Sequence, residues 1–208
     1  MDLSKNKFTS MQGLYHSELE ILQLKFNKLK LTNILHPDRL TRLHTLELRG
    51  NKLETMSGFN LPYLRHLYLA ENKIKQLNGI DSLIRIKLLH LRSNNIDNLD
   101  GFSNKMTKLT YLNLRDNKLS DFNEIIKLKC LPALKQLILL VNQLEEDREE
   151  MTTDVLMHIP GLARVDKVTV TNKEQREAKK KLKSLIAEAE KKQTAEEEDD
   201  HASDDNDP

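Results

Sequence analysis

Three histidines carry the side chains best suited to metal chemistry in this sequence. His44, His66 and His90 recur at intervals of 22 and 24 residues. Imidazole nitrogens bind Zn²⁺, but a zinc site needs several ligands that converge on one point. The three histidines fall at different positions of the repeat described below, and no Asp or Glu is placed beside them as a further ligand. We therefore predict no metal site and no cofactor.

The other groups that could take part in catalysis are isolated from one another. Glu47 and Asp116 lie three repeats apart, too far to act as an acid and base pair. The sequence has no glycine-rich phosphate loop, paired-cysteine motif or nucleophile elbow. Cys130, the single cysteine, is predicted to be a buried apolar filler. These features predict that the chain is not an enzyme.

A repeat of the form L-x-x-L-x-L-x-x-N-x-L positions these residues. Six copies match in full, and their starts lie 24, 21, 22, 23 and 25 residues apart. The pattern is that of leucine-rich repeats, whose leucines become buried only when neighbouring repeats stack. The ninth position is predicted to form a ladder of buried asparagines that satisfy backbone groups of adjacent repeats. Its members are Asn27, Asn51, Asn72, Asn94, Asn117 and Asn142.

The repeats predict a right-handed α/β solenoid with a parallel sheet on its concave side and short helices on its convex side. We expect repeats over residues 1–144, the first of them partial, and a C-terminal cap over 145–171. A charged helix is expected over 172–193 and a disordered acidic tail over 194–208. At the start, Leu3, Asn6 and Phe8 match only the second half of a repeat, so we expect another chain to cover this end.

The third, fifth and seventh repeat positions should point outward from the strands, and we call their side chains the concave surface. Arginine beside tyrosine or histidine is typical of protein interfaces, so this surface is predicted to bind protein rather than nucleic acid. In the last repeat Ile138, Leu140 and Val141 are expected to be exposed apolar groups that a partner covers. The candidate binding residues are Arg49, His66, Tyr68, Leu88, His90, Arg92, Tyr111, Arg115, Ile138 and Leu140.

The expected helix begins with a capping box at Thr171 and Glu174. Residues 173–192 hold eight basic and four acidic side chains, whereas 194–208 hold eight acidic side chains and no Lys or Arg. Leu182, Leu185 and Ile186 recur at helical spacing as an apolar stripe. We expect the stripe to dock a partner and the solenoid to fold without the helix.

The composition indicates the cellular compartment in which the protein works. The formal net charge is +1, one cysteine suits a reducing environment, and no apolar stretch reaches the roughly 18 residues of a membrane span. The first residues carry charges and no apolar signal sequence. We expect an intracellular protein that needs no membrane.

Four segments resemble the leucine-rich-repeat proteins of the axonemal radial spoke. They are residues 99–102, 105–115, 131–135 and 157–167. The resemblance implies a non-catalytic structural component of the third radial spoke in motile cilia, located in the axoneme and needed for beating. Its implied partners are other axonemal and spoke proteins, in a hetero-complex rather than a homo-oligomer, with no nucleic acid. A regulatory subunit of a protein phosphatase and a small ribonucleoprotein scaffold are the alternatives.

Overall fold

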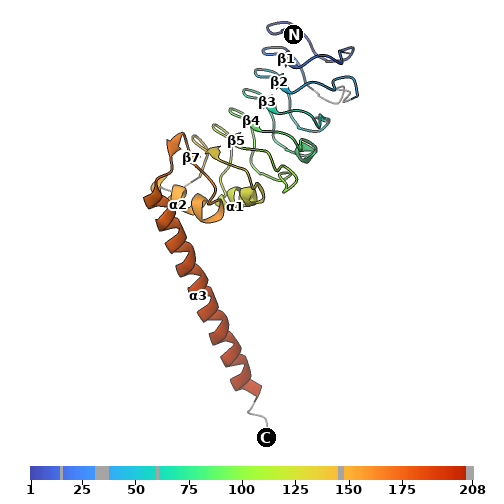
Figure 1. The fold of residues 1–208 in the computed structure, drawn as a ribbon. Coiled ribbons are helices and arrows are strands. Elements are labelled where there is room, and N and C mark those ends of the chain that lie inside the picture. Colours follow the sequence, from blue (N-terminus) through green and yellow to red (C-terminus); the bar gives the residue numbers. More distant parts are fainter. Residues whose placement is uncertain (15, 31–37, 60, 145–147, 205–208) are drawn as a thin grey trace.

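The repeats stack into a curved solenoid, and one long helix projects from its C-terminal end (Figure 1). The computed structural model describes residues 1–14, 16–30, 38–59, 61–144 and 148–204. One short strand per repeat lines one side of the solenoid. These strands are β1 (Ile21–Gln23), β2 (Thr45–Glu47), β3 (His66–Tyr68), β4 (Leu88–His90), β5 (Tyr111–Asn113) and β6 (Gln136–Ile138).

The sheet register follows the repeat. Strands β1 to β6 pair in sequence order and in parallel, and each repeat position lies opposite the same position of its neighbour, as Leu46 lies opposite Leu67. The fourth-position leucines Leu22, Leu46 and Leu67 are fully buried. The predicted α/β solenoid with strand alternation is therefore confirmed.

The asparagine ladder is formed as predicted. Asn94 Nδ2 donates to the carbonyl oxygens of Leu91 at 2.9 Å and of Leu69, in the preceding repeat, at 3.0 Å. Its Oδ1 accepts from the backbone N–H of Ile74 at 3.0 Å. Each asparagine thus satisfies backbone groups of two repeats. Five ladder residues are buried, and Asn142 is half-buried.

Short helical segments return the chain over the convex side. They are η1 (Ile80–Ser82), α1 (Phe122–Ile126) and η2 (Lys127–Cys130). Asp121 begins α1 by accepting a hydrogen bond from the backbone N–H of Asn123 at 2.8 Å, the usual role of an N-cap residue.

The cap closes the C-terminal end of the core with a helix and a hairpin. It consists of α2 (Arg148–His158), β7 (Arg164–Val165) and β8 (Val168–Thr169), and β7 extends the parallel sheet while β8 pairs with it antiparallel. Residues 145–147 of the expected cap lie outside the described residues. Asp166 is buried, and its Oδ1 accepts from the backbone N–H groups of Leu139 at 2.6 Å and Leu140 at 3.0 Å. An aspartate therefore ends the ladder.

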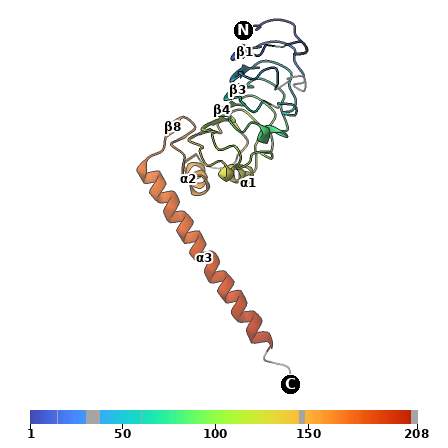
Figure 2. The same ribbon diagram turned by 45° about the vertical axis from the view of Figure 1, so that its right-hand side comes forward.

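The C-terminal helix α3 (Asn172–Asp204) begins at the predicted capping box (Figure 2). The backbone N–H of Glu174 donates to Thr171 Oγ1 at 3.2 Å, and the backbone N–H of Thr171 donates to the Glu174 carboxylate at 2.6 Å. The bond from the backbone N–H of Thr171, followed by one from the Thr171 hydroxyl at 2.7 Å, holds the pKa of the Glu174 carboxyl below its usual value. No helix in the described part of the chain is long and apolar enough to cross a membrane.

The C-terminal region differs from the sequence-based description in its tail and at the start of α3. The tail expected to be disordered from residue 194 continues as helix to Asp204, because the segment holds no Gly or Pro and many strong helix formers; residues 205–208 lie outside the described residues. The start of α3 also packs on the cap: Ala178 is buried, and Lys181 Nζ lies 2.6 Å from the Asp154 carboxylate.

Replacing Asn94 by Leu should lower the free energy of unfolding by about 1–3 kcal/mol, because two backbone carbonyls and one N–H lose their buried partner. Urea denaturation measures the change. Asn95→Ala is the matched control, since the half-buried side chain of Asn95 makes no hydrogen bond with another described residue. An unchanged midpoint for Asn94→Leu would contradict the ladder's contribution to stability.

Two truncations should separate the parts of α3. Deleting residues 172–208 should lower the free energy of unfolding by about 2 kcal/mol, because it uncovers the apolar side of α2 that Ala178 and Leu182 cover. Deleting residues 187–208 should change it by less than about 0.5 kcal/mol, since this segment lies beyond those contacts. Thermal or urea unfolding of both truncated chains checks the difference, and equal stabilities would show that α3 contributes nothing to the cap.

Candidate protein-binding surface

An aromatic row lies at the centre of the concave surface. Tyr68, His90 and Tyr111 occupy β3, β4 and β5, with ring centroids 6.3 Å and 6.5 Å apart. Sheet register places Tyr68 beside His90, while Tyr111 lies one column away and leans over the same histidine. All three side chains are half-buried. Rings held in this way give a large contact area that loses little conformational freedom on binding.

Asn113 orients the His90 and Tyr111 side chains of this row. Its Oδ1 accepts from the backbone N–H of Arg115 at 3.0 Å, so its Nδ2 faces His90 Nε2 at 3.2 Å and the Tyr111 hydroxyl at 3.2 Å. Because the amide donates, His90 Nε2 must accept, and the neutral ring carries its proton on Nδ1. Asn113 is buried, and the sequence-based set of binding residues missed it.

Burial keeps both histidines of the concave surface neutral. Desolvation is the largest cause that lowers the pKa of His90, followed by the positive charge of Arg92. Desolvation also lowers the pKa of His66, with a smaller contribution from His44. Burial raises the pKa of Tyr68, and the negative charge of Glu47 adds to the effect. The side chains of His66, Tyr68 and His90 are therefore uncharged at neutral pH.

The histidines form hydrogen-bonded pairs rather than a metal centre. Thr45 Oγ1 lies 3.0 Å from His44 Nδ1 and 3.1 Å from His66 Nδ1, so one hydroxyl joins the two rings. The described residues contain no group of three or more His, Cys, Asp or Glu arranged to hold a metal ion.

The arginines of the concave surface differ in their partners. Arg49 pairs with Glu71 at 2.6 Å, and its guanidinium also lies over the ring of Phe26. Arg92 is exposed, and no carboxylate of the described residues lies within 4 Å of its guanidinium. Arg115 is half-buried, and its buried Nε has no hydrogen-bond partner among the described residues. Arg92 and Arg115 thus flank the aromatic row with positive charge available to a ligand.

Two shallow hollows lie on either side of the row. The hollow beside His90 has a volume of about 210 Å³ and is lined by Glu47, Arg49, Tyr68, Ala70, Glu71, His90 and Arg92. The hollow beside Tyr111 has a volume of about 240 Å³ and is lined by Tyr111, Gln136, Leu137, Ile138, Arg164 and Lys167. Such hollows suit side chains of a protein partner better than a whole small molecule.

The exposure of the apolar side chains in the last repeat differs from the sequence-based prediction. Ile138 is only 4% exposed, so its predicted exposure is wrong. The hairpin of β7 and β8 lies next to β6 in the sheet, and Arg164 and Lys167 border the same hollow as Ile138. Leu140 is half-buried and Val141 is 60% exposed. The Leu88 side chain is half-buried on β4.

The isolated catalytic candidates have structural partners. Glu47 pairs with Lys25 at 2.8 Å, and the carboxylate of Asp116 accepts from the Ser93 hydroxyl at 2.6 Å. Cys130 is half-buried, and burial raises the pKa of its thiol, which opposes its activation as a nucleophile.

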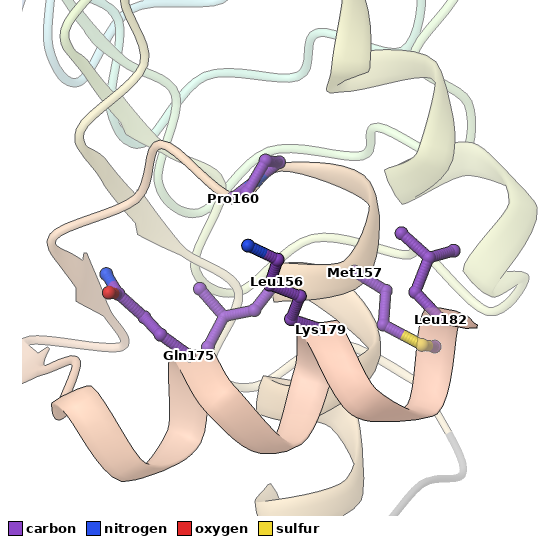
Figure 3. A pocket seen from close by; sticks show the side chains of 6 residues that line it. All are labelled: Leu156, Met157, Pro160, Gln175, Lys179 and Leu182. Carbon is purple, nitrogen blue, oxygen red and sulfur yellow. The ribbon is translucent and has the colours of Figure 1, made fainter. Parts of the chain in front are cut away.

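The apolar stripe of α3 is divided between the cap and solvent. Leu182 lies against the core, whereas Leu185 and Ile186 are 47% and 49% exposed. Figure 3 shows the hollow between α2 and α3, which has a volume of about 410 Å³. It is lined by Leu156, Met157, Pro160, Gln175, Lys179 and Leu182.

Strands stacked in this register, with aromatic and basic side chains on their outward face, are those of a leucine-rich-repeat protein. The chain belongs to the leucine-rich repeat family, whose sequence profile matches residues 39–195. It is 40% identical over 173 residues to the bovine (Bos taurus) leucine-rich repeat-containing protein 23, and 41% identical over 173 residues to the human (Homo sapiens) protein of that name. Each alignment covers 83% of this chain and 50% of the relative, so the chain spans about half the length of these relatives.

Solved structures share the fold. A leucine-rich-repeat protein of Leptospira interrogans superposes with a TM-score of 0.61 at 25% identity, over 79% of this chain and 41% of that one. An internalin of Listeria monocytogenes superposes with a TM-score of 0.59 at 23% identity, over 74% of this chain and 43% of that one. The internalin comparison supports the fold alone.

The half-buried histidines His66 and His90 should make stability depend on pH. Because folding lowers the pKa values of His66 and His90 below the ordinary value of 6.5, the unfolded chain takes up these protons first as the pH falls. The stability that the neutral rings contribute is present above about pH 6.5 and is lost as the pH falls through the folded pKa values. Urea midpoints measured between pH 7.5 and pH 5 should therefore fall more steeply for the wild type than for the His66→Gln/His90→Gln variant. Parallel curves would contradict this assignment.

Proposed function

We propose that the chain is a non-catalytic scaffold that holds a protein partner on its concave surface. The observation that carries the proposal is the row of Tyr68, His90 and Tyr111, flanked by Arg92 and Arg115. Aromatic and arginine side chains dominate the energetics of protein interfaces, especially where backbone and neighbours already fix them. The row is rigid because backbone pairing and the Asn113 amide hold it in place.

We further propose that the scaffold is a structural component of the axonemal radial spoke, the third spoke in particular, and is needed for ciliary motility. The 40% identity to leucine-rich repeat-containing protein 23 supports this assignment, together with the resemblance of residues 99–115 and of the cap to radial-spoke proteins. Its partners would then be other spoke and axonemal proteins in a hetero-complex, and its location the ciliary axoneme.

A second candidate is the targeting of a protein phosphatase. A plant (Arabidopsis thaliana) protein named as a protein phosphatase 1 regulatory inhibitor subunit homologue is 32% identical over 78 residues, which is 37% of this chain. The shorter overlap and lower identity place this function second. A tagged full-length chain that co-purifies with a phosphatase catalytic subunit, and is absent from cilia, would favour it.

The concave surface can be tested by charge reversal. Arg92→Glu with Arg115→Glu should weaken retention in the axoneme about tenfold, because both guanidinium groups flank the proposed contact. The measurement is the salt-extractable fraction of the tagged protein in ciliated cells, after circular dichroism has shown an unchanged fold.

Lys105→Glu with Lys108→Glu is the matched control. It changes the net charge equally at two exposed residues outside the concave surface, so it should extract like the wild type. If the arginine variant also extracted like the wild type, the concave surface would not be the contact. A tagged wild-type chain that is absent from cilia would reject the radial-spoke assignment while leaving the concave surface open to another partner.

A further inference from the structure

The chain is electrostatically divided along its length, although its net charge is close to zero. Residues 1–144 contain 22 Lys and Arg against 13 Asp and Glu, a formal net charge of +9. Residues 145–208 contain 11 Lys and Arg against 19 Asp and Glu, a formal net charge of −8. The solenoid is therefore a strongly basic body, and part of its charge is arranged in a line.

A column of lysines follows the asparagine ladder. The repeat position directly after each ladder asparagine is a lysine in most repeats and is never acidic. We call this set the lysine column. Its members are Lys7, Lys28, Lys52, Lys73 and Lys118, and the same position holds Asn95 and Gln143 in the other two repeats. All five lysines are exposed.

Backbone hydrogen bonds between neighbouring repeats fix the spacing of the column. The backbone N–H of Lys28 donates to the carbonyl of Phe8, that of Lys52 to Leu29 and that of Lys73 to Leu53, each at 2.8 Å. The same bond recurs at Asn95 and Lys118, at 2.8 Å and 2.9 Å. Because each repeat adds one strand to the sheet, successive lysines are anchored about 5 Å apart. The column is thus a regularly spaced row of positive charge rather than a set of scattered surface lysines.

The charges of the column have no partner in the described part of the chain. None of the five ammonium groups lies within 4 Å of a carboxylate of the described residues, whereas Lys25 and Lys75 each form an ion pair. Glu54 and Asp97 lie further along the same loops, where they border a hollow of about 660 Å³ together with Lys73, Lys75 and Lys118. Four lysines in consecutive repeats, from Lys7 to Lys73, form the uninterrupted part of the line.

We propose that the lysine column binds an acidic α-helix of another protein. Carboxylates at every third or fourth residue of a helix lie about 5–6 Å apart on one face, which matches the spacing of the lysines. Nucleic acid fits less well, since the column contains no aromatic residue for base stacking and no arginine for bidentate phosphate contacts. This surface is separate from the aromatic row, so the proposal stands independently of the function proposed for the concave surface.

The test uses the full-length chain and a fluorescent synthetic helix of alanine and glutamate with Glu at every fourth residue. Fluorescence anisotropy at low salt should show binding that weakens as salt rises. The variant Lys28→Gln/Lys52→Gln/Lys73→Gln should bind about tenfold more weakly or worse. The control Lys105→Gln/Lys108→Gln/Lys129→Gln removes the same charge at exposed positions outside the column and should bind like the wild type.

Three results would overturn the proposal. Equal affinities of the two triple variants would show that general charge, not the column, attracts the peptide. Tighter binding of a single-stranded RNA oligonucleotide, lost in the column variant, would make the column a nucleic-acid site. Sedimentation that shows a salt-sensitive dimer, abolished only by the column variant, would assign the column to the acidic end of a second copy rather than to another protein.

Discussion

The buried asparagine amide is the interaction on which the rest of the structure depends. A chain that turns out of a three-residue strand leaves backbone N–H and C=O groups without partners inside the solenoid. The side chain of Asn51 satisfies such groups in its own repeat and in the preceding one, by donating to Leu48 and Leu24 and accepting from Leu29. An unsatisfied buried polar group costs about 1–3 kcal/mol. Each repeat therefore needs its neighbour to satisfy its buried backbone groups as well as to bury its leucines.

The ladder also explains why the surface of the molecule is organised in columns. It stops repeats from slipping against one another, so residues at equivalent positions are stacked about one strand spacing apart. Only a few positions per repeat, mainly the leucines and the asparagine, are needed for the stability of the fold. The others can vary from repeat to repeat, and their side chains gather into continuous rows such as Tyr68 beside His90, or the lysines that follow Asn27 and Asn51.

Periodicity made most of the fold predictable from the sequence. The repeat pattern identified the ladder, the strand register and the concave columns, because each depends only on a residue's place in its own repeat. Contacts between different elements were not predictable in this way. Ile138 has an outward position but is buried, between Asn113 and a hollow that the cap hairpin borders, and Ala178 belongs to a helix that packs on α2. Asn113 holds His90 from a neighbouring strand, a contact that no single repeat records.

The C-terminal end of the ladder shows how the same requirement is met by different chemistry. At the C-terminal end the turn between β7 and β8 replaces a repeat, and the carboxylate of Asp166 accepts from two N–H groups where a ladder asparagine accepts from one. An acceptor-only side chain suits this place, because it receives the N–H groups of Leu139 and Leu140 while Asn142 already donates to the carbonyl of Leu139. The hairpin that Asp166 anchors leads directly into α3. Lys181 and Ala178 then hold the start of that helix against the cap, and α3 projects away from the solenoid (Figure 1), with Leu185 and Ile186 exposed on it. The hydrogen bonds of Asp166 at the end of the core thus determine where α3 begins, as the asparagine ladder determines where the side chains of the concave surface lie.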